Sequence, residues 1–90
     1  MSGDELATAG DHLSAAAEDI GTDEDATRLS ELADQLHRLA DADHGPDHGR
    51  LARIQAAIDE IQPEADDDVA ATLAAANDAI NEYREDLEGV

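Results

Sequence analysis

The chain has 90 residues, with 24 acidic side chains against 5 basic ones, and its formal charge at pH 7 is -19. This excess of negative charge repels phosphate backbones and anionic lipid surfaces, which argues against nucleic acid and membrane surfaces as partners. Cysteine and lysine are absent, which excludes disulfides, thiol or lysine nucleophiles and zinc–thiolate sites. The sequence shows no basic segment before an apolar stretch and no apolar run of 18 residues, so we expect neither export nor a membrane span.

The composition points in two directions. Alanine supplies 19 residues and the larger aliphatic residues only 16, and a low aliphatic content with a high net charge is typical of disorder. The helical periodicity described below indicates a folded chain instead. Salt reconciles the two, because at 1 M the Debye length falls to about 3 Å and self-repulsion is screened. We therefore expect a cytoplasmic protein whose folding depends on salt.

Two helices are predicted in the first half of the chain, over residues 4–20 and 22–40. Leucine or isoleucine recurs every seventh residue in the first, although Gly10 lies in its interior and weakens it by about 1 kcal/mol relative to alanine. Gly21 suits the position just after this helix, and Thr22 suits the N-cap of the next. The second helix carries leucines spaced by three, four and three residues: Leu29, Leu32, Leu36 and Leu39.

Two further helices are predicted over residues 46–62 and 66–88. Pro46 suits the first helical position of the third helix, and Pro63 ends it. This helix repeats the spacing of the second, with Leu51, Ile54, Ile58 and Ile61. Aspartates at 66–68 offer an N-cap for the fourth helix, whose apolar stripe is Val69, Leu73, Ala76, Ile80, Tyr83 and Leu87.

Four amphipathic helices joined by short connections predict an all-α, antiparallel up-down bundle that forms a single helical domain over residues 1–90. The predicted core is thin for a chain of this length, because 16 large aliphatic residues oppose the ordering entropy of 90 residues. Self-association would bury more of the apolar stripes. We therefore favour a homodimer over a monomer.

One segment departs from the acidic background. Residues 37–53 carry three acids and three arginines, so their formal charge is zero while the remaining 73 residues carry all of the -19. The bundle register places Tyr83, the only aromatic residue, near this segment. The candidate ligand or partner patch is therefore His37, His44, His48, Arg50, Arg53 and Tyr83.

Three kinds of chemistry are compatible with this segment. His44, His48 and Asp47 have the ligand types for Zn²⁺ or Ni²⁺, but Gly45 and Pro46 keep the histidines from sharing a regular helical face, so we predict no metal site. The arginines and the start of the third helix suit a small anion. A histidine–aspartate pair suits a general base, but no nucleophile accompanies it, so we expect no enzyme activity and no cofactor.

A purely structural interpretation accounts for the same residues. Glycine, proline and aspartate suit a loop that caps a helix, and the arginines suit ion pairs with acidic faces of neighbouring helices or of a second subunit. On this interpretation His37 lies at the edge of the apolar stripe and Tyr83 packs in the core.

The stretch from Gly45 to Ile54, GPDHGRLARI, lies within this acidic helical pattern and resembles small uncharacterised helical proteins of halophilic archaea. The resemblance extends over most of the chain. It implies a helical fold and a salty cytoplasm, and it implies no activity.

The sequence thus favours a non-enzymatic helical protein that self-associates or binds an unknown protein partner at high salt. The alternative is a small ligand-binding protein that uses residues 44–53 for a metal ion or a small anion. A third hypothesis is an acidic mimic of nucleic acid that occupies the basic groove of a partner, but its charge is no greater than adaptation to salt would produce.

Overall fold

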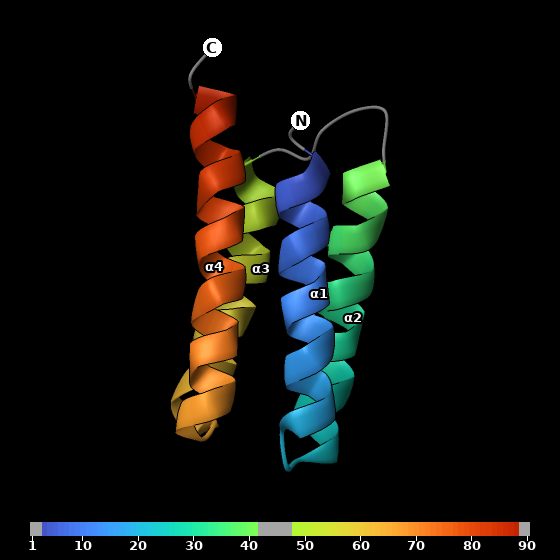
Figure 1. The fold of residues 1–90 in the computed structure, drawn as a ribbon, viewed down its shortest axis with the longest axis vertical. Coiled ribbons are helices and arrows are strands. Elements are labelled where there is room, and N and C mark those ends of the chain that lie inside the picture. The colour runs from blue at the N-terminus through green and yellow to red at the C-terminus, as the bar shows by residue number, and fades with distance from the viewer. Residues whose placement is uncertain (1–2, 42–47, 89–90) are drawn as a thin grey trace.

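The structure, a computed structural model, describes residues 3–41 and 48–88, with side chains over 4–41 and 49–85. The described chain forms four α-helices, α1 (Gly3–Asp19), α2 (Asp23–Asp41), α3 (His48–Ile61) and α4 (Asp67–Glu88), and no strand. The helices run side by side with alternating direction in a bundle with Cα extents of 39 × 19 × 19 Å (Figure 1). The predicted all-α helical bundle is confirmed.

The four predicted helices are all present, and their ends lie within one or two residues of the predicted bounds. After Ile61 the chain continues as one turn of 3₁₀ helix over Gln62–Glu64. The helix α3 thus ends just before Pro63, as predicted. The N-cap predicted for α4 is Asp66, whose Oδ1 accepts a 2.9 Å hydrogen bond from the backbone N–H of Val69. Pro46, predicted at the start of the third helix, lies outside the described residues.

Gly21 follows α1 as predicted, but its backbone is not left-handed. Among the described residues no glycine has a positive φ, and nothing lies within 4 Å of the position that a Cβ would take at Gly21. The connection between α1 and α2 is therefore a short turn that does not depend on the conformational freedom of glycine.

The core is continuous along the bundle and contains the predicted apolar stripes. No polar or charged side chain is buried in the described part of the chain. Ile20 and Leu39 lie at the ends of their stripes and are only partly buried, and the side chain of Leu87 lies outside the described residues. The buried aliphatic residues other than alanine are Leu6, Leu13, Leu29, Leu32, Leu36, Leu51, Ile54, Ile58, Ile61, Val69, Leu73 and Ile80.

Helix α1 packs closely against both α2 and α4, whereas α3 stands further from its neighbours. Figure 1 shows α1 between α4 and α2, with α3 behind. Small buried residues explain the close contacts of α1, because alanine lets two helix backbones approach: Ala9, Ala16, Ala33, Ala76 and Ala79. The stripe of α3 consists of leucine and isoleucine, which hold its backbone away. The spacing of the four helices is therefore uneven.

Candidate functional site

The structure separates those residues of the predicted patch whose side chains it describes, namely His37, Arg50, Arg53 and Tyr83. Arg50 and Arg53 lie on α3 and line a groove between α2 and α3. Tyr83 is 4% exposed and packs in the core, so it does not contribute to the surface of the groove. His44 and Asp47 lie outside the described residues, as does the side chain of His48 at the start of α3.

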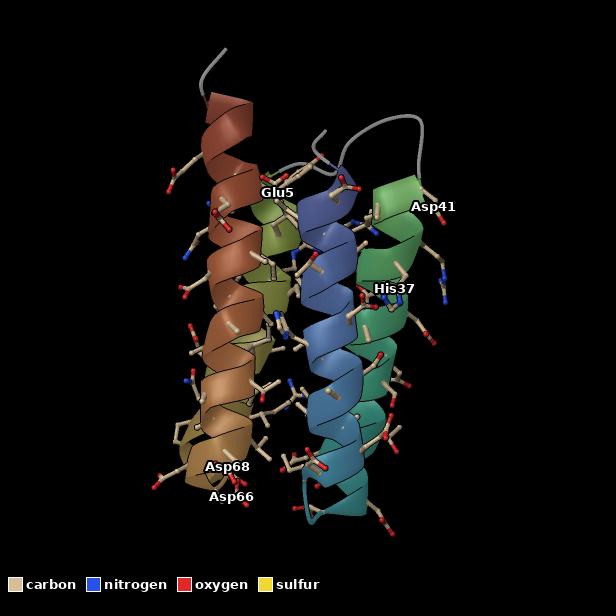
Figure 2. All side chains as sticks on the ribbon, viewed as in Figure 1. Glu5, His37, Asp41, Asp66 and Asp68 are labelled. Atoms are coloured by element: carbon tan, nitrogen blue, oxygen red, sulfur yellow. The ribbon has the colours of Figure 1, made fainter. Side chains whose placement is uncertain are left out.

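His37 lies on the opposite side of α2, against α1. Its Nε2 atom is 3.0 Å from Oδ1 of Asp11, and its ring lies over Gly10. Figure 2 shows the ring at the edge of α2 that faces α1. A Cβ at Gly10 would be 2.7 Å from two ring atoms, so the glycine that weakens α1 makes room for the histidine. His37 thus helps to dock α1 on α2 and is not part of the groove.

The groove between α2 and α3 has a volume of about 350 Å³ and is lined by Leu32, Gln35, Arg50, Arg53 and Ile54. Leu32 and Ile54 are 9% and 2% exposed, so they form its floor, while the exposed arginines form its rim. Gln35 is half-buried on the α2 side. The groove therefore has an apolar floor and a polar, cationic rim.

The positions of these residues follow from helical spacing. Arg50, Arg53, Ala57 and Glu60 recur at three and four residues along α3, which places them on one flank of the helix. Glu60 accepts from Arg28 of α2 at 3.4 Å, which shows that this flank faces α2. Ala57 is too small to reach across, so space remains between the arginines and this ion pair.

The Arg28–Glu60 pair differs from the pairing that spacing along α2 favours. Pairs four residues apart within α2, Glu24 with Arg28 and Asp34 with Arg38, have the favourable orientation for ion pairs. In the described part of the chain neither pair lies within 4 Å, and Arg28 bonds to α3 instead. An interhelical pair at this point holds α2 and α3 together at one end of the groove.

The opposite flank of α3 is fixed to α4 by a polar network. The side-chain amide of Gln55 donates to Oδ1 of Asn81 at 2.9 Å and accepts from Arg84 at 2.7 Å. One turn further along, Asn77 donates to Asp59 at 3.1 Å. These bonds hold α3 toward α4, which leaves the α2 side of α3 as its less closely packed flank.

The groove is cationic although the chain is strongly acidic. Its lining residues include two arginines and no carboxylate. Arg53 forms neither a hydrogen bond nor an ion pair with any residue that the structure describes. The wall of α2 across from it offers Gln35 and Leu32, which are uncharged. Arg53 therefore presents its guanidinium to whatever enters the groove.

Guanidinium groups bind carboxylates and phosphates through paired, charge-assisted hydrogen bonds, and an amide adds a further donor. The arrangement thus suits an anionic group. The lining residues supply no nucleophile and no general base. Over residues 4–41 and 49–85, no group of three histidine, aspartate or glutamate side chains is arranged to hold a metal ion. The weak metal candidates His44, His48 and Asp47 are not covered by this observation.

Sequence reasoning singled out the two arginines but missed Gln35, Leu32 and Ile54 as their neighbours. A signal for Gln35 was present, because it follows Arg28 by seven residues and so lies on the same flank of α2. Without knowing that this flank faces α3, the spacing could not be used.

None of the described helices is long and apolar enough to cross a membrane.

Comparison with protein families matches residues 1–86 to a family of unknown function (DUF7553). No curated protein and no solved structure matches the chain.

Proposed function

The chain belongs to the DUF7553 family, a family of unknown function. We propose that the protein is a non-enzymatic binding module that holds an anionic group in the groove between α2 and α3. The observation that carries this proposal is a groove lined by Arg50, Arg53 and Gln35, without a carboxylate, on a chain with a charge of -19.

The overall charge does not prevent local binding of an anion. The attraction between Arg53 and a bound carboxylate acts over about 3–4 Å, whereas most acids of the bundle lie much further away. At about 1 M salt the screening length is about 3 Å, so the nearest charges dominate. A long polyanion would extend beyond the groove and would be repelled by the net charge of -19 on the chain. The groove thus suits a small anion and disfavours a nucleic acid.

We further propose that the protein works in the cytoplasm of a halophilic organism and folds best at high salt. The acids of the described part are exposed or half-buried, and none is in the core. Apart from Oε1 of Glu5, which is buried, their repulsion therefore acts between solvated surfaces, where salt screens it. The resemblance of residues 45–54 to proteins of halophilic archaea supports the same setting.

An NMR titration tests the binding proposal. Potassium acetate replaces potassium chloride at constant ionic strength, and the Nε–Hε signal of Arg53 is followed. We expect a saturable shift in the wild type and in Arg38→Gln, because Arg38 is exposed on α2 and does not line the groove. In Arg53→Gln, the shifts that acetate causes in the backbone signals around the groove should be lost. This variant removes one positive charge, as the control Arg38→Gln does.

Equal loss in both variants would assign the effect to net charge and would contradict the proposal. The absence of a saturable shift in the wild type would also contradict it. Circular dichroism of the three proteins checks that each has the same helical content.

Self-association, or contact with a protein partner, is the second candidate function. The apolar stripes that suggest it are largely covered within one chain. What favours it is the partly exposed Leu39, which lies seven residues after Leu32 and so on the same side of α2. Sedimentation velocity in about 2 M KCl tests this candidate. A homodimer is expected if it is right, and a monomer at all concentrations contradicts a homodimer.

A further inference from the structure

We infer that the anion bound in the groove is a small organic acid, with its carboxylate on Arg53 and its short hydrocarbon body over Leu32 and Ile54. This inference rests on the proposed function and specifies the chemistry of the ligand. It uses three properties of the groove: its size, its apolar floor and the distribution of charge around it.

The size of the groove exceeds what an inorganic anion needs. Its volume of about 350 Å³ is close to the lower limit of ligand pockets and corresponds to roughly twelve water molecules of liquid volume. Chloride or phosphate on Arg53 would leave most of this space to water. A ligand of several carbon atoms would fill it.

The floor of the groove suits the hydrocarbon part of such a ligand. Leu32 is 9% exposed, at the upper end of the exposure found in the core, and Ile54 lies beside it. Gln35 stands at the rim, and its amide forms no hydrogen bond with any residue described by the structure. A carboxylate on Arg53 can accept a bond from this amide while its alkyl chain covers the leucine and isoleucine.

The charge pattern favours one carboxylate over a multiply charged ligand. Each additional negative charge on the ligand is repelled by the net charge of -19 on the chain, whereas a single carboxylate is matched by one guanidinium. Chloride at high concentration also competes with any ligand that binds the arginine through charge alone. Apolar contact is not weakened by salt, so it allows an organic acid to bind where chloride is abundant.

A ligand series at constant ionic strength tests the inference. Potassium acetate, butyrate and hexanoate are titrated into the folded protein, with inorganic phosphate as the comparison, and each Kd is taken from groove signals. Leu32 and Ile54 leave little apolar surface exposed, so we expect one step of about two- to fourfold in Kd between acetate and butyrate and little further change for hexanoate. Phosphate should bind more weakly than butyrate. Intermolecular NOEs should connect the butyrate methylenes to the methyl groups of Leu32 and Ile54.

Equal Kd values for acetate, butyrate and hexanoate, without NOEs to the floor, would overturn the inference but leave anion binding intact. Tighter binding of phosphate than of butyrate would overturn it in the same way. If not even acetate shifts Arg53, the proposed function fails as well. Shifts of Arg53 that depend on protein concentration without any acid would assign the groove to a second copy of the chain, and would also overturn the inference.

Discussion

Replacing Gly10 with alanine tests how α1 docks on α2. In the interior of a helix this change normally stabilises a protein by about 1 kcal/mol. Here the new Cβ would lie 2.7 Å from Cδ2 and Nε2 of His37, closer than atoms in van der Waals contact. The ring has to move, and its hydrogen bond to Asp11 at 3.0 Å is lost. Such overpacking costs about 1–3 kcal/mol.

In the wild-type background, the gain from replacing a glycine within a helix and the cost of overpacking against His37 nearly cancel. The His37 side chain is 39% exposed and can swing toward solvent, so we expect the lower part of the overpacking range. Gly10→Ala should then change the free energy of unfolding by between zero and about 1 kcal/mol in the destabilising direction. In a His37→Ala background the clash is absent, and Gly10→Ala should stabilise by about 1 kcal/mol.

Urea unfolding of the four proteins at one fixed KCl concentration gives the coupling energy between Gly10 and His37. We expect about 1–2 kcal/mol, well above the 0.3–0.5 kcal/mol within which independent sites add. Gly21→Ala is the matched control, because its Cβ would meet nothing within 4 Å and its backbone is not left-handed. It should stabilise by about 0.4–1 kcal/mol in both backgrounds. If Gly10→Ala stabilised both backgrounds equally, the packing of His37 on Gly10 would be refuted.

Three further predictions use the same unfolding assay. Asp66→Ala should destabilise the protein by about 1 kcal/mol, because α4 loses its N-cap. Asp66→Asn should change the stability little, because asparagine keeps an acceptor for the N–H of Val69. Equal losses of stability in the two variants would rule out the cap. Leu73→Ala should cost about 2–5 kcal/mol at a fully buried position, against less than about 0.5 for Ala71→Gln on the exposed side of α4. Raising KCl from about 0.2 to 2 M should increase the urea midpoint, and an unchanged or lower midpoint would contradict the proposed adaptation to salt.

The fold was predictable because it depends on local spacing. The three-four-three spacing of Leu29, Leu32 and Leu36 fixes one buried face of α2, and the same spacing fixes a buried face of α3. Pro63 and Asp66 mark the ends of helices by local chemistry alone. These features need no knowledge of how the helices pack.

Partners across helices were not predictable in the same way. Arg28 has a suitable acid four residues earlier at Glu24, yet it pairs with Glu60 of α3. Gly10 looked like a weakness in α1, and its role became visible only with the His37 ring over it. In both cases the deciding quantity is the distance between two helices, which periodicity within one helix does not contain.

The groove also results from the distances between the helices. Alanines draw α1 toward α2 and α4, and the Gln55 network holds α3 toward α4, so the space remains on the α2 side of α3. The sequence showed the lower acidity of residues 37–53 and thereby the two arginines. It did not show that His37 turns away from them toward α1.

A crystal in which bromide replaces chloride tests whether the groove between α2 and α3 holds an anion. The anomalous signal of bromide locates bound anions without any assumption about their contacts. We expect a strong bromide peak in the groove, beside the guanidinium of Arg53 and the amide of Gln35. A groove without bromide, in a crystal where bromide is bound at other arginines such as Arg38, would contradict it.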